Sequence, residues 1–217
     1  MSVTNGHMRP RDEGLGASLA QALSKAQVSP EAVLIAGVGF ALGGSVAFGL
    51  AGLSEGGARV VWLGFAVISI QFRMTCAVVG RLMTDDAVKG PATPLWKSLP
   101  DRIADVLLLV GAGYASLQAG DVLSPALGWL CAVLAVTASY VRELGRGAGV
   151  AINRVGPVGK GRRMAILSAG ALVSMLEWTW GWHGEALLIA LALLAALSAL
   201  TVFNRARRLA RGLRPKG

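Results

Sequence analysis

The sequence is poor in charged residues and in histidine. Only 15% of its 217 residues are charged, whereas about a quarter are charged in an ordinary soluble domain. Hydrophobic residues make up 54% of the chain. A soluble chain of this composition would lack the polar surface needed to cover its core, but a bilayer accepts apolar faces wherever the backbone is hydrogen-bonded. The composition therefore indicates a membrane protein.

Cysteine is also scarce, and no processing signal stands out. The two cysteines, Cys76 and Cys131, both lie in apolar runs, and neither has a partner at a metal-ligand spacing. This argues against a disulfide or a zinc site. The first 16 residues are polar and contain no apolar core of a signal peptide, so we expect no cleaved leader. The isolated His7 and His183 are expected to be surface residues.

Long apolar stretches are present instead. A helix needs about 20 apolar residues to cross the hydrocarbon core. Six stretches qualify, near 32–53, 60–83, 103–119, 124–141, 164–181 and 186–203. We predict an all-α polytopic bundle of six transmembrane helices. Residues 15–204 would form one membrane domain, between a polar tail at 1–14 and a basic cytoplasmic tail at 205–217.

The basic residues gather on alternate connections of this bundle. One side would carry Lys89, Lys97, Arg142, Arg146, Arg154, Lys160, Arg162, Arg163 and the basic tail, and the other side only Arg59. Positive residues favour the cytoplasmic side, so the pattern predicts a multi-pass protein of the cell inner (plasma) membrane with both termini cytoplasmic. Tryptophans would mark the opposite interface, at Trp62, Trp129, Trp178, Trp180 and Trp182. The membrane topology thus accounts for the net charge of +9, and we expect no nucleic-acid partner.

A short helix is expected before the first span. Its apolar face would be formed by Leu15, Leu19 and Leu23, which recur every four residues. We expect this amphipathic helix to lie along the cytoplasmic membrane surface. Ser29 and Pro30 then supply an N-cap and a first-turn proline for the first span.

Two predictions concern contacts between helices. Gly39 and Gly43 are four residues apart, a spacing that is common where two membrane helices approach closely. Arg73 and Glu177 both fall deep within predicted spans. Because isolated charges are costly in a bilayer, we predict that these two residues form an interhelical ion pair.

Asp101 and Asp105 are the most informative polar residues. They lie one helical turn apart and therefore project from one face. Two carboxylates there could bind a divalent cation or remove a proton from an alcohol. Alternatively, Ser98 and Asp101 form a capping box, and the charge of Asp101 favours the helix N-terminus. Capping leaves Asp105 unexplained, and intramembrane carboxylates generally have a function.

These residues resemble part of the CDP-alcohol phosphatidyltransferase motif, D-x2-D-G-x2-A-R-x8-G-x3-D-x3-D, whose last two acids match Asp101 and Asp105. The family consists of six-helix membrane enzymes that move a phosphatidyl group from a CDP-linked lipid to an alcohol and release CMP. Similar segments extend along the chain, at SPEAVLIAG (29–37), at 71–73 with Cys76, and at Gly156, Pro157, Lys160, Arg163 and Met164. The resemblance implies a role in phospholipid biosynthesis for the domain at 15–204.

The first half of that motif is degenerate. Its first two acids fall on Ala77 and Gly80, or on Gly80 and Met83 in another register. In the first register the motif glycine falls on Arg81. The resemblance implies Mg²⁺ or Mn²⁺ held by Asp101 and Asp105, with Asp105 also as the catalytic base, while Asp85 could add a ligand.

Three basic residues are candidates for phosphate binding. The resemblance places Lys160 and Arg163 at a pocket for the phosphate of the acceptor. Arg81 can grip a phosphate bidentately and replace part of the missing metal charge. A positive-inside cluster would have the same composition, so the sequence leaves both interpretations of these residues open.

Two hypotheses of function follow. The first is a CDP-alcohol phosphatidyltransferase that acts on a CDP-linked lipid and an alcohol acceptor among membrane lipids, with a homodimer implied by the family. The alternative is a catalytically inactive homologue that binds lipid or nucleotide, or serves as a structural membrane subunit. A small transporter is a third, weaker hypothesis, because the sequence has no inverted repeat.

Overall fold

The computed structural model describes residues 15–86, 93–115, 122–150, 156–182 and 184–213, and these residues contain helices and no strand. The elements are α1 (Leu15–Lys25), α2 (Pro30–Gly52), α3 (Gly56–Asp86), α4 (Thr93–Tyr114), α5 (Leu123–Gly147), α6 (Lys160–Ser174), the 3-10 turn η2 (Glu177–Thr179) and α7 (Glu185–Gly212). The predicted all-α class is confirmed. The predicted tail at 1–14 lies outside the described residues.

Four helices, α2, α3, α5 and α7, are long and apolar enough to cross a bilayer. This finding indicates a membrane protein. Among the described helices, α4 and α6 do not reach the same standard. Helix α6 has 15 residues and is therefore about 22 Å long, while the hydrocarbon core measures about 30 Å. The count of six transmembrane helices and their orientation stay predictions.

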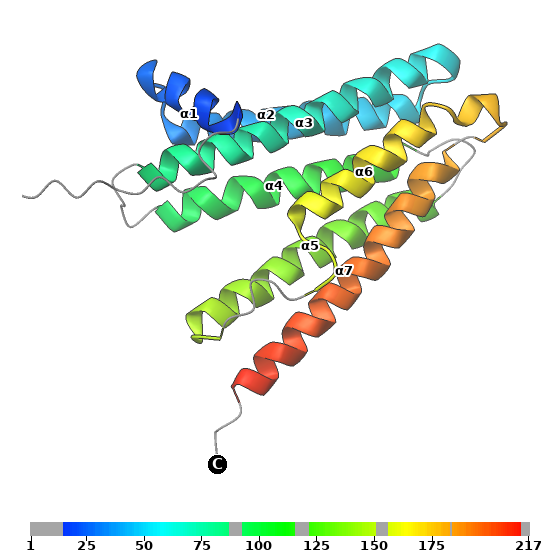
Figure 1. The fold of residues 1–217 in the computed structure, drawn as a ribbon. Helices are drawn as coiled ribbons and strands as arrows, with labels where there is room; N and C mark the ends of the chain where they lie inside the picture. The colour runs from blue at the N-terminus through cyan, green and yellow to red at the C-terminus, as the bar shows by residue number, and fades with distance from the viewer. Residues whose placement is uncertain (1–14, 87–92, 116–121, 151–155, 183, 214–217) are drawn as a thin grey trace, which may run out of the picture.

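The helices form a bundle in which α4 is central. Helices α2, α3 and α4 lie side by side, while α5 and α7 run diagonally to them as a second pair (Figure 1). Helix α4 packs on α2 and α5, and α6 packs on α7 and α3. The core is apolar, with fully buried side chains at Phe48, Leu63, Ile70, Leu108, Leu109, Leu187, Leu191 and Leu194.

The N-terminal helix and its connection to α2 form as expected. The Oγ of Ser29 accepts a hydrogen bond from the backbone N–H of Ala32 at 3.2 Å, and Pro30 opens α2. Helix α1 packs on α3. Its packed face is centred on Ala20, which is buried, whereas Leu19 of the predicted apolar face is 47% exposed. The position of α1 on the membrane surface stays a prediction.

The predicted close contact at Gly39 and Gly43 is not formed among the described helices of the chain. Both residues are exposed, and no atom of another described helix lies within 4 Å of a Cβ placed on either of them. The close approach is made by Gly44, where an added Cβ would lie 2.9 Å from Leu108 Cδ2 and 3.0 Å from Ser69 Cβ. The buried face of α2 also contains Gly37. The glycine pair with the typical spacing therefore lies on the outer face of α2.

Arg59 ties several helix ends together on one side of the bundle. Its Nη1 donates hydrogen bonds to the carbonyl oxygens of Ala51 at 3.0 Å and Ala115 at 2.7 Å. Its Nη2 donates to Ser174 Oγ at 3.1 Å and lies 3.9 Å from Glu177 Oε2. The last turns of α2, α4 and α6 are thereby linked to the first turn of α3.

The predicted ion pair between Arg73 and Glu177 is wrong. Helix α6 ends at Ser174, so Glu177 lies in the η2 turn at the Arg59 end of the bundle. Its Oε1 accepts a hydrogen bond from the backbone N–H of Ala186, near the start of α7. The depth that we assigned to Glu177 assumed an uninterrupted helix to residue 181.

Candidate functional site

Asp101 and Asp105 lie one turn apart on α4, and both face residues from α3 and α6. Because α4 begins at Thr93, Asp101 lies in the third turn. The capping-box interpretation is therefore wrong. The Oγ of Ser98 accepts a hydrogen bond from Arg102 Nη2 at 3.5 Å, so Ser98 caps no helix start.

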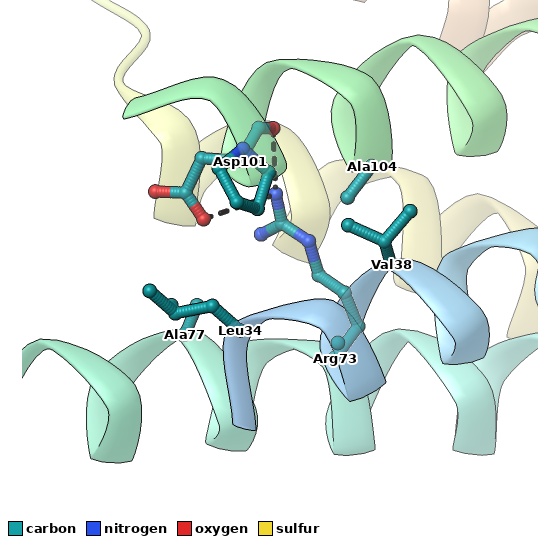
Figure 2. Close-up of a pocket in the computed structure, with 8 residues that line it drawn as sticks. Leu34, Val38, Arg73, Ala77, Asp101 and Ala104 are labelled. Atoms are coloured by element: carbon teal, nitrogen blue, oxygen red, sulfur yellow. Dashed lines mark hydrogen bonds and ion pairs between the residues drawn. The ribbon is translucent and has the colours of Figure 1, made fainter. Parts of the chain in front are cut away.

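Asp105 is buried between two arginines. Its side chain accepts a hydrogen bond at Oδ1 from Arg73 Nη2, at 2.6 Å, and at Oδ2 from Arg163 Nη1, at 2.9 Å. Asp105 is 3% exposed and Arg73 is 1% exposed. Arg73 also donates to the backbone oxygen of Asp101 at 3.0 Å. Figure 2 shows the Arg73 side chain extending from α3 toward Asp101, between α2 and α4.

Asp101 is contacted by three cations. Its Oδ2 accepts a hydrogen bond from Arg81 Nη2 at 2.9 Å, and its Oδ1 accepts one from Lys160 Nζ. Arg73 Nη2 lies 3.6 Å from Oδ1. Burial raises the pKa of Asp101, but Lys160, Arg81 and Arg73 together bring that pKa below its ordinary value. Asp101 is therefore an anion at neutral pH.

The pKa of Lys160 is also shifted by burial and by the charges around it. Burial lowers the pKa of Lys160 to about 8, and repulsion by Arg73 adds to this effect, while Asp101 opposes it. Lys160 is the first residue of α6 and, like Asp101, lies outside the predicted spans. Its ammonium group is the only one of the four cations here whose charge changes near neutral pH, because arginine stays protonated.

We call these six residues the Asp101–Asp105 cluster: Arg73, Arg81, Asp101, Asp105, Lys160 and Arg163. Four cations face two carboxylates, so the cluster has a formal excess of two positive charges. Arg163 Nε is buried and has no hydrogen-bond partner among the described residues. The side chain of Arg81 is 45% exposed and forms the open edge of the cluster.

The structure thus brings together all the predicted site residues whose side chains it describes. Asp85 lies in the last turn of α3, but its side chain is outside the described part of the chain. Ala77 lines a small pocket beside Asp101, whereas Met83 packs in a separate apolar cluster with α1. This placement favours the register in which the motif acids fall on Ala77 and Gly80 and the motif glycine on Arg81.

The pocket beside Arg73 is small. Its volume is about 10 Å³, and it is lined by Leu34, Gly37, Val38, Arg73, Ala77, Pro100, Asp101 and Ala104 (Figure 2). A cavity of this size has room for about one water molecule. A phosphate-sized group would therefore have to approach the cluster from its exposed edge, at Arg81.

Sequence reasoning missed the role of Arg73. The sequence spacing contains a signal for this role. Arg73 and Asp105 are equally far along the sequence from Lys89, which belongs to the connection between α3 and α4. Two antiparallel helices joined by a short connection place residues equidistant from it at similar depth. Counting from the connection would have paired Arg73 with Asp105.

The described residues do not fit a divalent cation. They contain no group of three or more aspartate, glutamate, histidine or cysteine side chains that could hold a metal ion. Asp101 and Asp105 accept hydrogen bonds from four cations, and Mg²⁺ and Mn²⁺ require free oxygen ligands. A divalent ion would add charge to a cluster that is already positive.

Solved structures of one enzyme share this fold, although no protein-family model and no curated protein matches the chain. These structures are of the phosphatidylinositol phosphate synthase of Mycobacterium tuberculosis. Its complex with CDP-DAG has a TM-score of 0.72 at 18% identity, covering 94% of this chain and 98% of that one. Its complex with manganese and citrate gives 0.70 at 18%, covering 94% of each chain. The apo form gives 0.71 at 20%, covering 89% and 95%.

Proposed function

We propose that this membrane protein is a CDP-alcohol phosphatidyltransferase of phospholipid biosynthesis, which moves a phosphatidyl group from a CDP-linked lipid to an alcohol and releases CMP. The observation that carries the proposal is the position of the Asp101–Asp105 cluster. Helices α3, α4 and α6 supply its acids and cations at one place. The bundle that holds them has the fold of a phosphatidylinositol phosphate synthase, which was solved with CDP-DAG bound.

Each residue of the cluster has a proposed role. Transfer of a phosphate group depends mainly on positioning and on positive charge near the phosphate oxygens. Arg81, Lys160 and Arg163 would contact these oxygens. A P–O bond forms between the alcohol oxygen and the phosphatidyl phosphorus, the P–O bond to CMP breaks, and Asp105 takes the proton of the alcohol. Asp105 can act as this base once a bound phosphate draws Arg73 or Arg163 from its carboxylate.

The metal requirement is part of the proposal's test. The structure of the neighbouring enzyme with manganese agrees with the Mg²⁺ or Mn²⁺ that the family resemblance implies. In this chain the carboxylates of Asp101 and Asp105 are engaged by cations, so the roles above are assigned to side chains alone. The assay therefore includes reactions with Mg²⁺, with Mn²⁺ and with EDTA.

The deciding experiment measures CMP release by full-length protein in lipid nanodiscs supplied with CDP-diacylglycerol and a panel of alcohols. We expect alcohol-dependent release that disappears in Asp105→Asn. Glu143→Gln is the matched control, because Glu143 is also a carboxylate paired with arginine, Arg146 at 2.8 Å, but lies outside the cluster on α5. Absence of CMP release with every acceptor and metal would refute transferase activity.

A catalytically inactive homologue is the second candidate. One observation favours it: the four carboxylate oxygens of Asp101 and Asp105 all accept hydrogen bonds from arginine or lysine. Both oxygens of Asp105 are engaged by guanidinium groups, which leaves neither oxygen free to contact the hydroxyl of an alcohol. This candidate predicts binding of CDP-diacylglycerol without CMP release in the same assay.

The proposal extends to topology and assembly. We propose an inner-membrane protein with both termini in the cytoplasm, supported by the basic residues on α7, Arg205, Arg207, Arg208 and Arg211. Reporter fusions at each terminus test this orientation, and a periplasmic C-terminus would refute it. A homodimer is proposed from the family resemblance alone, and mass measurement in nanodiscs tests it.

A further inference from the structure

We infer that the Asp101–Asp105 cluster binds the diphosphate of a lipid-linked nucleotide through its own four cations, without a divalent metal ion. The inference rests on the proposed function for the identity of the headgroup. It concerns binding alone, so it holds for an active transferase and for an inactive homologue.

The charge of the cluster carries the first step. Its four cations and two carboxylates leave a formal excess of two positive charges. A diphosphate diester carries one negative charge on each phosphate and would therefore neutralise the cluster. A divalent cation would instead raise the excess to four in a partly buried site, where repulsion between like charges is screened weakly.

Unused hydrogen-bond donors carry the second step. Arg163 is 5% exposed, and its Nε has no partner among the described residues. Within the described part of the chain, the one acceptor for Arg73 Nη1 is Met74 Sδ, at 3.3 Å, and a thioether is a weak acceptor. Buried donors without good acceptors are rare in folded proteins. Phosphate oxygens would satisfy these donors, and a metal ion would not.

Asp101 explains how an anion can reach the cations. The side chain is 14% exposed, and its two oxygens accept hydrogen bonds from Arg81 and Lys160, which come from different helices. A phosphate group offers oxygens with similar spacing to the same donors. Asp101 therefore occupies the position of a ligand phosphate, and a bound diphosphate would displace its carboxylate from Arg81 at the exposed edge.

This role gives Asp101 an effect opposite in sign to that of a metal ligand. If Asp101 competes with the phosphate, Asp101→Asn removes the competing charge and strengthens binding. If Asp101 holds a metal ion that bridges to the phosphate, the same substitution weakens binding. The sign of the change in affinity thus separates the two models of the site.

The experiment measures the affinity of full-length protein in nanodiscs for CDP-diacylglycerol, in EDTA and in Mg²⁺. We expect the two dissociation constants to agree within about twofold, because no metal-dependent contact is involved. We expect Arg81→Gln to weaken binding about tenfold or more, as loss of a charge-assisted hydrogen bond does, and Asp101→Asn to strengthen it. Size-exclusion profiles of each variant confirm folding.

Arg162→Gln is the matched control. Arg162 is exposed on α6 and donates to the carbonyl oxygen of Pro157 at 2.8 Å, away from the cluster. It carries the same charge change as Arg81→Gln, and we expect unchanged affinity. An equal loss in both variants would show a general charge effect and overturn the inference.

Loss of binding in EDTA that Mg²⁺ restores would also overturn it, as would weaker binding by Asp101→Asn. These outcomes differ from failure of the proposed function. CMP release together with metal-dependent binding would refute the inference and support the transferase, whereas EDTA-resistant binding without CMP release would support the inference and refute the transferase.

Discussion

Substitution of Arg73 is expected to destabilise the bundle strongly. Its side chain is fully buried and donates to Asp105 Oδ1 at 2.6 Å and to the backbone oxygen of Asp101 at 3.0 Å. Arg73→Met keeps much of the side-chain volume but leaves Arg163 as the one ion-pair partner of Asp105 among the described residues. Removing one partner of a buried ion pair costs about 3–5 kcal/mol. We expect about 3 kcal/mol here, because Arg163 still neutralises Asp105.

The assay is reversible unfolding of the purified protein in mixed micelles, followed by loss of helical circular dichroism. A double-mutant cycle with Asp105→Asn isolates the interaction from effects of each residue elsewhere. Because the two residues touch, we expect the double variant to be more stable than additivity predicts, by about 1–3 kcal/mol. Arg81→Met is the control, since its side chain is 45% exposed and exposed pairs contribute about 1 kcal/mol or less.

Two results would refute this reasoning. One is a loss below about 1 kcal/mol in Arg73→Met, which would mean that water reaches and screens the pair. The other is strict additivity in the cycle, which would mean that Arg73 stabilises the fold without its contact to Asp105.

Three further predictions concern other parts of the molecule. Burial and Arg73 lower the pKa of Lys160 to about 8, so its charge is present below that pH and lost above it, and the affinity for CDP-diacylglycerol should fall as the pH rises from about 7 to 9. The Lys160→Arg variant should bind equally at both pH values, and a falling affinity in that variant would contradict the assignment. Arg59→Met should reduce the unfolding free energy by about 3 kcal/mol, because the carbonyl oxygens of Ala51 and Ala115 lose the hydrogen bonds from Arg59 and the buried Glu177 loses its cation. Unchanged stability would contradict this prediction. Gly111→Ala should destabilise the protein by about 1–3 kcal/mol, since the added Cβ would lie 2.6 Å from Ser45 Cα. Gly39 is exposed, so Gly39→Ala should be neutral or slightly stabilising. Equal shifts of the two variants in thermal melts would contradict the close packing at Gly111.

The sequence predicted features that depend on local pattern. Apolar length predicted where the long helices lie, and the Ser29–Pro30 pair predicted the start of α2, which the hydrogen bond to Ala32 confirms. The one-turn spacing of Asp101 and Asp105 predicted that they share a face of α4, and both meet cations there.

The failures concern features that depend on neighbouring helices. Gly39 and Gly43 have the spacing of a helix contact, but the described neighbours of α2 within the chain lie on the face of Gly44. The charge of Glu177 matched Arg73 at the assumed depth, yet α6 ends at Ser174 and brings Glu177 to Arg59. Spacing alone does not say which face of a helix is covered, and composition alone does not say where a short helix stops.

The pairing of Arg73 with Asp105 has a consequence for biogenesis. Helix α4 does not qualify as a span by length and composition, and an isolated carboxylate at its depth would oppose transfer from the translocon into lipid. Arg73 precedes Asp105 in synthesis and lies on the adjacent helix, so its guanidinium is in place when α4 emerges. We therefore expect α3 and α4 to partition into the bilayer as one hairpin, whose charges cancel before lipid surrounds them.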